Sequence, residues 1–483
     1  MTPLSANNLP EHIDAPRYNR DAVKAGVVHF GIGNFHRAHQ AVYIDELLSR
    51  GDMQWGITGV SLRSASMRDA LKPQDYLYTL AVLGEATEYR VIGALMNILV
   101  APENPQSVID MLAQPDTQLV TSTITEKGYN LTSGRVDMEH PALKAELASL
   151  DSPTTIYGFL ARGIIARRQT DSASKLTIMC CDNISGGGEH LKAGTEYLLA
   201  AHNEPALGWS KDHVSFISSM VDRVSPATDD GLRDKVAQAT QRQDVSPVSA
   251  EPFTQWIIED NFAGQRPEFD KVGAIFIDDI APYERMKLQY LNAAHTIIST
   301  LGYLSGEKFV HGSMQRPPLF NFMRQALNKN ILPNAAVPDG YDGRVYIADV
   351  IGRFQNGNLP YANLQVGTDS SQKIQQRWFP TIEHAIINKA DTSYFEFALG
   401  AWVIFIHTAL KNNVLNDPKR SDFEAVKTAS LKEMGARYLE IANGAQFSFY
   451  SDADFMRAVT QYAETIKSGG IEPAINDFLA AQK

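Results

Sequence analysis

The segment from Lys287 to His295 places three side chains with useful chemistry in one apparent helix. Its sequence is Lys-Leu-Gln-Tyr-Leu-Asn-Ala-Ala-His, and apolar residues surround it. Because burial disfavours the charged form of a lysine, the pKa of Lys287 is expected to fall toward neutral pH. Such a lysine can take a proton from an alcohol and return it to a ketone. Asn292 and His295 could then hold the oxygen on which charge develops.

A regular helix does not bring these three groups into line. At about 100° per residue, Asn292 lies roughly 140° around the axis from Lys287, and His295 roughly 80°. The three side chains share one broad face only if the lysine stem extends or the helix bends. A structural helix whose lysine extends to solvent, and whose other polar groups are satisfied in the core, would show the same sequence.

A second segment, residues 27–40, predicts a dinucleotide-binding turn. An apolar run enters Gly31-Ile-Gly33, and an amphipathic helix is expected to follow. Strand, glycine turn and helix open the βαβ unit that binds dinucleotides. Gly31 would allow the tight turn, Gly33 would let the backbone approach a pyrophosphate, and the helix N-terminus would offer N–H groups to the anion. His36 replaces the usual third glycine.

Further blocks in the same order resemble the mannitol dehydrogenase family, the polyol-specific long-chain dehydrogenases/reductases. The resemblance extends from about residue 25 to about residue 470. The blocks are Gly-x-Gly-x-Phe-His-Arg-x-His at 31–39, Thr-Ile-Thr-Glu-Lys-Gly-Tyr at 123–129, Cys-Asp-Asn at 181–183, Met-Val-Asp-Arg at 220–223, Glu-Pro-Phe at 251–253 and Asp-Ser-Ser-Gln-Lys at 369–373.

The resemblance implies a lysine-dependent oxidoreductase that needs no metal. Lys287 is implied as the general acid/base, and Asn183, Asn292 and His295 as the groups that hold the reacting oxygen. Lysine then takes the place that zinc holds in other alcohol dehydrogenases, and the chain has no Cys-x-x-Cys or His-Glu-x-x-His motif. Glu284, three residues before Lys287, either helps pass the proton to solvent or is a solvated carboxylate of the first helical turn.

The remaining candidate residues are expected to bind substrate and cofactor. Asp222 and Lys373 are implied to bind the substrate, with Gln365 and Arg377 as further candidates. The expected cofactor-binding residues are Gly31, Gly33, Asn34, Phe35, Arg37, Arg63, Ser64, Thr123, Thr125 and Glu126.

Cofactor choice depends on the end of the second strand, residues 59–68. A carboxylate there would bind the ribose hydroxyls of NAD and repel the 2′-phosphate of NADP. Family members that prefer NAD tend to carry an acid near Ser64, and this segment has none there. Arg63, Ser64, Ser66 and Arg68 could accommodate a phosphate. We predict measurable use of NADP(H), with NAD(H) still possible.

Two substrate classes remain open. Residues 59–64 and 74–80 resemble the mannitol 2-dehydrogenase branch, whereas residues 372–377 resemble the hexuronate branch, which interconverts fructuronate and mannonate. Gln365 stands where the mannitol branch tends to have an arginine. Arg377 is the nearby candidate partner for a uronate carboxylate. We favour a polyol/ketose pair over a uronate pair.

The composition is typical of a soluble globular protein. The chain has 483 residues, of which 44% are hydrophobic and 20% charged. Its net charge of −11 argues against nucleic acid as the main partner. The two cysteines are adjacent, so no disulfide framework is expected. The N-terminus lacks a signal-peptide pattern, the apolar stretch 397–410 is too short for a membrane span, and we expect a cytoplasmic monomer.

The pattern of elements changes near residue 278. Before it, strand-like runs alternate with helical patterns, which predicts a Rossmann-type, doubly wound, mostly parallel α/β sheet over residues 1–278. After it, helical periodicity dominates, which predicts a mostly α-helical substrate and catalytic domain over residues 279–483. The predicted strands are 55–62, 89–92, 118–124, 176–181, 214–217 and 272–277, and the predicted helices of the second part are 283–304, 317–329, 394–411, 422–441 and 452–467.

Two readings from other classes compete. Tyr283-x-x-x-Lys287 matches the catalytic pair of short-chain dehydrogenases, but those enzymes are about half this length and have a different glycine motif. A Rossmann-type sensor would bind nucleotide without turnover. A buried lysine with two amides and a histidine argues against a sensor, because binding alone does not require an acid/base.

Overall fold

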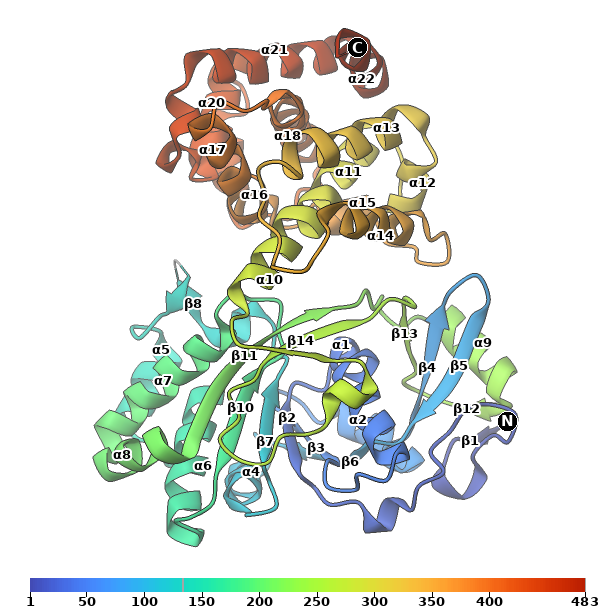
Figure 1. The fold of residues 1–483 in the computed structure, drawn as a ribbon, viewed down its shortest axis with the longest axis vertical. Helices are drawn as coiled ribbons and strands as arrows, with labels where there is room; N and C mark the ends of the chain where they lie inside the picture. Colours follow the sequence, from blue (N-terminus) through green and yellow to red (C-terminus); the bar gives the residue numbers. More distant parts are fainter. Residues whose placement is uncertain (133, 483) are drawn as a thin grey trace. The chain divides into compact units, whose positions relative to one another are not determined.

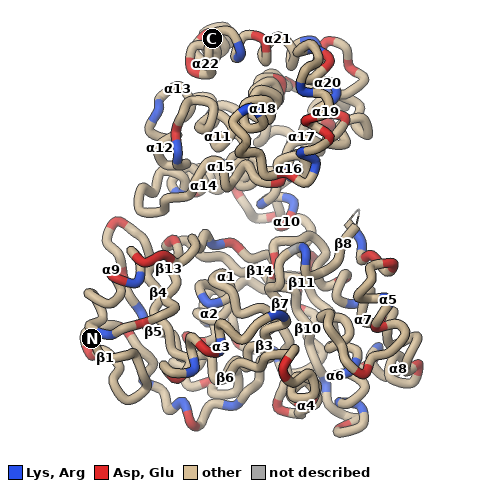
Figure 2. Tube along the Cα trace, turned by 180° about the vertical axis from the view of Figure 1, so that it is seen from behind, with Lys and Arg blue, Asp and Glu red and all other residues tan. Residues whose placement is uncertain are grey.

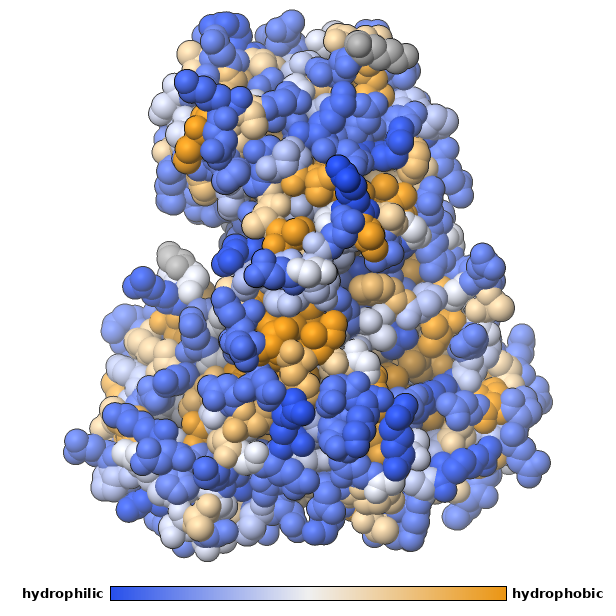
Figure 3. Space-filling view, viewed as in Figure 1, coloured by the Kyte–Doolittle hydropathy of each residue, from blue (hydrophilic) through white to orange (hydrophobic). Residues whose placement is uncertain are grey.

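The computed structural model describes residues 1–132 and 134–482. They divide into two compact units, with the boundary between Ala281 and Pro282. Figure 2 shows acidic and basic residues interspersed along both units. Figure 3 shows a largely hydrophilic surface on the face in view, with apolar residues in smaller areas.

An eight-stranded sheet forms the centre of the first unit, with the order β15-β14-β11-β10-β7-β2-β3-β6 (Figure 1). Neighbouring strands are parallel except for β11 and β14. The expected fold class, a Rossmann-type domain followed by a helical one, is confirmed. The strands are β2 (Val27–Phe30), β3 (Ile57–Ser61), β6 (Leu95–Val100), β7 (Leu119–Ser122), β10 (Leu176–Cys180), β11 (Val214–Asp222), β14 (Gln255–Glu259) and β15 (Ile275–Ile277).

Both faces of this sheet are buried, and consecutive residues around the end of β10 show why. Ile178 and Cys180 pack in one core with α6 (Ile156–Thr170) and α7 (Gly187–His202). Met179 and Cys181 pack in the opposite core with α2 (Gln40–Ser49). Successive side chains of a strand point to opposite faces, so the two adjacent cysteines are separated by the sheet. Both are free thiols.

A smaller sheet, β13-β4-β5, accompanies the main one. The predicted strand 89–92 lies here, paired antiparallel with β4, rather than in the parallel sheet. The remaining elements of this unit are β1 (Thr2–Pro3), β4 (Tyr78–Leu83), β5 (Thr87–Ile92), β8 (Leu131–Thr132), β9 (Arg135–Val136), β12 (Arg242–Gln243), β13 (Val248–Ala250), α1 (Asn34–Ala38), α3 (Ser66–Leu71), α4 (Pro105–Ala113), α5 (Pro141–Ala148), α8 (Glu204–His213), α9 (Asp230–Thr240), η1 (Ala6–Asn8), η2 (Arg20–Ala22), η3 (Lys72–Gln74), η4 (Glu126–Tyr129) and η5 (Phe269–Val272).

The expected amphipathic helix is present as α2, but the helical stretch that follows the glycine turn is not continuous. It divides at His39, whose φ of −127° and ψ of −90° are not helical, into α1 and α2. The buried His39 ring stacks on Phe35 at 5.2 Å, and its Nε2 lies 2.9 Å from the carbonyl oxygen of Gln255 in β14. The helix is thus interrupted at the residue whose side chain contacts the sheet.

Helices build the described part of the second unit, with one isolated β-bridge between Phe309 and Ala362. Helix α18 runs through the core; by length and composition alone it could cross a membrane, but 78% of its most apolar window is buried within the protein. The helices are α10 (Ala281–Lys287), η6 (Leu288–Asn292), α11 (Ala293–Leu304), α12 (Val310–Met314), α13 (Pro317–Ala326), η7 (Leu327–Ile331), α14 (Gly343–Gln355), α15 (Asn363–Val366), α16 (Ser370–Arg377), α17 (Phe379–Ile387), α18 (Ser393–Lys411), α19 (Arg420–Val426), α20 (Leu431–Ile441), η8 (Gly444–Gln446), η9 (Ser448–Ser451), α21 (Ala453–Gly469) and α22 (Ile471–Ala481).

Candidate active site

The loops that follow the parallel strands of the first unit meet at one edge of the sheet. The chain leaves β2 for β3 and β6 on one side and returns to β7 on the other, so the strand order reverses between β2 and β7. Ligands of open α/β sheets bind outside the carboxyl ends of the strands at such a reversal. The residues at or just after these ends are Gly31 (β2), Arg63 (β3), Thr123 (β7), Asn183 (β10) and Asp222 (β11).

The two glycines of the turn differ in what surrounds them. Gly31 has a φ of +100°, and a Cβ there would lie 2.0 Å from the carbonyl oxygen of Thr123. Only glycine fits this backbone and this close approach of β2 to β7. At Gly33, a Cβ would meet no described atom within 4 Å. Gly33 is exposed and leaves open space beside the turn, as backbone approach to a pyrophosphate requires.

A buried histidine, which the sequence analysis missed, holds this turn. The Nε2–H of His29 donates to the carbonyl oxygen of Gly31 at 3.0 Å, and its Nδ1 accepts from the hydroxyl of Thr121 at 2.7 Å. The ring also stacks on His36 at 3.4 Å between centroids. Burial lowers the pKa of His29 to about 3, so the ring is neutral and keeps this tautomer. The sequence feature that could have indicated this role is a histidine within a strand of otherwise apolar residues.

The loop after β7 is joined to the loop after β10. Thr125 has a φ of +68°, which costs a non-glycine residue strain, and its N–H donates to the Asp182 carboxylate at 2.7 Å. The hydroxyl of Thr123 donates to the carbonyl oxygen of Cys181 at 3.1 Å. These bonds fix the backbone just before Asn183, whose side chain is exposed. The side chain of Glu126 lies outside the described part of the structure.

Two of the predicted cofactor-binding residues, Asn34 and Arg37, make hydrogen bonds within the protein next to the turn. Arg37 is 1% exposed and donates to the carbonyl oxygen of Ser246 and, at 2.8 Å, to the side-chain oxygen of Asn34. The Asn34 amide donates to Thr228 at 3.1 Å. The Arg37 side chain therefore braces α1 rather than facing solvent. The ring of Phe35 stacks on the ring of His39.

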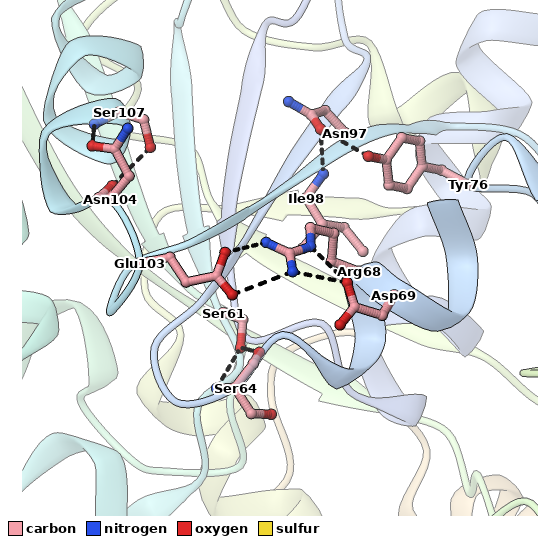
Figure 4. Close-up of polar contacts among 10 residues, drawn as sticks. All are labelled: Ser61, Ser64, Arg68, Asp69, Tyr76, Asn97, Ile98, Glu103, Asn104 and Ser107. Carbon is pink, nitrogen blue, oxygen red and sulfur yellow. Dashed lines mark hydrogen bonds and ion pairs between the residues drawn. The ribbon is translucent and has the colours of Figure 1, made fainter. Parts of the chain in front are cut away.

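The segment after β3 meets an acid that follows another strand, β6 (Figure 4). Arg68 donates two hydrogen bonds to the carboxylate of Glu103, which follows β6, and one of 2.9 Å to Asp69. Ser64 donates its N–H to the hydroxyl of Ser61, and that hydroxyl donates to the Ser64 carbonyl oxygen at 2.7 Å. Arg63 is exposed. The segment near Ser64 lacks an acid in sequence, but Glu103 supplies one in space.

The second unit presents Lys287 and Asn292 from one irregular helix. Lys287 ends α10, the π-helical η6 spans the next five residues, and Asn292 is its last residue. Because a π-helix bonds residue i to residue i+5, a five-residue spacing closes about one turn, and we infer that these two residues share a face. The sequence estimate of roughly 140° between them assumed a regular α-helix and does not apply. Both residues are 8% exposed.

Asn292 is one of the buried side chains with a polar atom that lacks a partner among the described residues. Its amide nitrogen is buried and has no hydrogen-bond partner among the described residues. A buried donor without a partner costs roughly 1–3 kcal/mol, so such groups require an explanation, and a catalytic or ligand-binding role is one. His295 is half-buried on α11, between the rings of Phe354 at 4.6 Å and Tyr361 at 5.0 Å. Glu284 is half-buried one turn before Lys287.

Helix α16 carries two of the predicted substrate ligands. Lys373 donates to the carbonyl oxygen of Val366 at 3.1 Å. Arg377 donates to the carbonyl oxygen of Asn292 at 3.3 Å and to the Thr296 hydroxyl at 2.8 Å. Its guanidinium therefore contacts the helix of Lys287 directly. Gln365 is exposed on α15. Among the residues that the structure describes, no cluster of three or more metal-ligating side chains is found.

Comparisons with known proteins match both units. A sequence model described as the mannitol dehydrogenase Rossmann domain matches residues 25–271, and one described as the mannitol dehydrogenase C-terminal domain matches residues 279–467. The polyol:NADP oxidoreductase of Gluconobacter oxydans (strain 621H) is 34% identical, covering 83% of this chain and 84% of its own. The D-mannonate oxidoreductase of Escherichia coli (strain K12) is 31% identical over 98% of this chain and 99% of its own.

A solved structure is also similar along the whole chain. It is the mannitol 2-dehydrogenase of Pseudomonas fluorescens in a ternary complex with NAD and D-mannitol. The TM-score is 0.86 and the sequence identity 32%, and the match covers 99% of this chain and 100% of that one.

Proposed function

The chain belongs to the mannitol dehydrogenase family, and from this premise we propose that it interconverts a sugar alcohol and its ketose, with Lys287 as general acid/base. The observation that carries the proposal is the pairing of a buried lysine with the unpartnered amide of Asn292 across the π-helical segment. An amine that exchanges a proton and a donor without a partner are what a reacting C–O group needs.

In the proposed oxidation, the neutral amine of Lys287 accepts the hydroxyl proton as the carbon–oxygen bond becomes a carbonyl. A nicotinamide cofactor, when bound, would supply the hydride acceptor for the same carbon. Asn292 and Asn183 donate hydrogen bonds to the oxygen as negative charge develops, and His295 orients it. Glu284 passes the proton from Lys287 to solvent. Reduction runs the same steps backward, so it begins from protonated Lys287 and is expected to tolerate lower pH than oxidation.

The first unit fits a dinucleotide, because the turn at Gly31 is fixed by His29 and the space beside Gly33 is open. We propose that Thr123 and Thr125 line the cofactor, and that Arg63 and Ser64 meet the ribose or its 2′-phosphate. The P. fluorescens enzyme holds NAD, whereas the G. oxydans relative is named for NADP. Because Glu103 and Asp69 already compensate the charge of Arg68, we expect activity with both cofactors rather than a strong preference for NADP.

Hexuronate reduction is the second candidate, supported by the similarity to the E. coli D-mannonate oxidoreductase. A uronate carboxylate would need a guanidinium, and Arg377 was the candidate. Arg377 instead donates to Asn292 and Thr296, which favours a neutral substrate bound by Asp222 and Lys373. A monomeric state, a cytoplasmic location and independence of metal remain predictions.

One plate of initial rates tests the proposal. NADH and NADPH oxidation is measured with fructose, sorbose, xylulose, fructuronate and tagaturonate, with and without a chelator. We expect turnover of a neutral ketose, unchanged by the chelator. Turnover of a uronate alone would favour the second candidate. Cofactor binding without turnover of any of these substrates would contradict the proposal and support a nucleotide sensor.

A further inference from the structure

The π-helical segment η6 is not specified by unusual residues of its own. Its five residues, Leu-Gln-Tyr-Leu-Asn, contain no glycine or proline, and the flanking segments α10 and α11 are ordinary α-helix. Single π-turns inside α-helices are rare and occur frequently at functional sites. Contacts from outside the segment are therefore candidates for what favours the wider turn over a regular one.

Side chains donate hydrogen bonds to the carbonyl groups at the C-terminal end of η6 and just after it. The carbonyl oxygen of Asn292 accepts from the Thr296 hydroxyl at 3.0 Å and from Arg377 at 3.3 Å. The next carbonyl, that of Ala293, accepts from the indole N–H of Trp378 at 3.2 Å. Arg377 also donates to the Thr296 hydroxyl at 2.8 Å, which completes a closed set of bonds.

These donors sit in a well-packed place. Trp378 is fully buried and Thr296 is 2% exposed, whereas Arg377 is half-buried at the end of α16. Side chains that insert into the hydrogen-bond ladder of a helix are a known cause of its irregularities. Arg377 is the only one of these three donors that carries a charge, and a charged donor strengthens a hydrogen bond.

We propose that Arg377 is a positioning residue: by holding the carbonyl of Asn292 it keeps η6 in its π-helical form and so keeps the Asn292 amide on the face of Lys287. This inference rests on the proposed function. If the segment relaxed to a regular α-helix, Asn292 would rotate to roughly 140° from Lys287. The lysine and its oxygen-binding partner would then no longer meet at one reacting oxygen.

The test replaces Arg377 by methionine, which keeps the length of the stem and removes its donors. We expect kcat with the best ketose to fall about a hundredfold, as small displacements of catalytic groups do, with little change in KM or in the Kd for NADH. Arg377→Lys should recover part of kcat, because an ammonium can still donate to Asn292 and Thr296. The matched control is Gln376→Ala, an exposed change on the same helix that should leave kcat unchanged.

Amide hydrogen exchange gives a readout that does not depend on turnover. Exchange across residues 288–297 should be faster in Arg377→Met than in the wild type, and unchanged in Gln376→Ala. If Arg377→Met does not fold, Thr296→Val removes one donor without removing the charge, and its kcat should fall by a smaller factor.

Two results would overturn the inference. A large rise in KM at normal kcat would mean that Arg377 contacts the substrate. A folded Arg377→Met or Thr296→Val variant with wild-type kcat would mean that the contacts do not align Asn292. Neither result bears on the proposed function, which fails only if the wild-type protein itself turns over no ketose.

Discussion

The glycine turn after β2 and the π-helical segment η6 both depart from regular backbone beside residues that we propose for function. The turn depends on one residue type: Gly31 has a positive φ, and the Thr123 carbonyl leaves no room for a Cβ. Segment η6 is built from residues that suit an ordinary helix, and its last carbonyl oxygen, that of Asn292, accepts from Thr296 and Arg377, while the next one, that of Ala293, accepts from Trp378. An irregular backbone can thus depend on one residue type, such as glycine, or on contacts from side chains elsewhere in the chain.

The difference also separates binding from chemistry. The turn belongs to the unit that fits the cofactor, and its substitution should act on cofactor affinity and stability. Segment η6 belongs to the unit that carries the proposed acid/base, and its substitution should act on kcat. Variants in the two regions therefore test whether the roles divide in this way.

The largest effect is expected for Lys287→Ala. It removes the acid/base and a charge next to the reacting oxygen, so kcat should fall by at least about 10³-fold while NADH still binds. Single-turnover kinetics and fluorescence titration with NADH measure the two quantities. Tyr283→Phe is the control: its ring packs on Tyr341 at 5.4 Å, and near-normal activity is expected. Loss of activity in Tyr283→Phe would instead support short-chain dehydrogenase chemistry.

The next effect contrasts the two glycines of the turn. Gly31→Ala forces a Cβ against the Thr123 carbonyl at a φ of +100° and should destabilise the protein by about 1–3 kcal/mol or more. Gly33→Ala meets no described atom, so its melting temperature should stay normal while its Kd for NADH rises. Thermal unfolding and NADH titration of both variants check this. Normal cofactor affinity in Gly33→Ala would show that no pyrophosphate approaches there.

The same contrast explains what the sequence could predict. Local patterns were sufficient for the alternating strands, the helical second unit and the turn at Gly31, because glycine and apolar periodicity act within a few residues. The angle between Lys287 and Asn292 around the helix was not predictable, since one of the two side chains that donate to the Asn292 carbonyl, Arg377, lies 85 residues along the chain. The contact between Arg68 and Glu103 was not predictable for a similar reason, since Glu103 follows another strand, 35 residues away.

A smaller effect concerns the pH dependence of the free energy of unfolding, through His29 beside the turn. The pKa of His29 is lowered from 6.5 to about 3 by burial, so below pH 6.5 the unfolded chain binds a proton that the folded protein does not. Stability should therefore fall as pH drops from 6.5 toward 3, by up to about 2 kcal/mol between pH 6.5 and 5 from this group. His29→Gln should remove that part of the slope in urea unfolding. An unchanged slope would mean that His29 titrates normally.

The smallest effect is expected at the end of β3. Glu103→Gln removes a carboxylate from Arg68, which then retains Asp69 and gains freedom to meet a 2′-phosphate. Because Arg68 and Glu103 are solvent-accessible and screened, the ratio of kcat/KM for NADPH to that for NADH should rise only a few-fold. Asp110→Asn, an exposed change on α4, serves as the control and should leave the ratio unchanged. A fall in the ratio would mean that Glu103 holds Arg68 in the orientation that binds the phosphate. In that case the ion pair would be part of the cofactor site rather than a competitor for it.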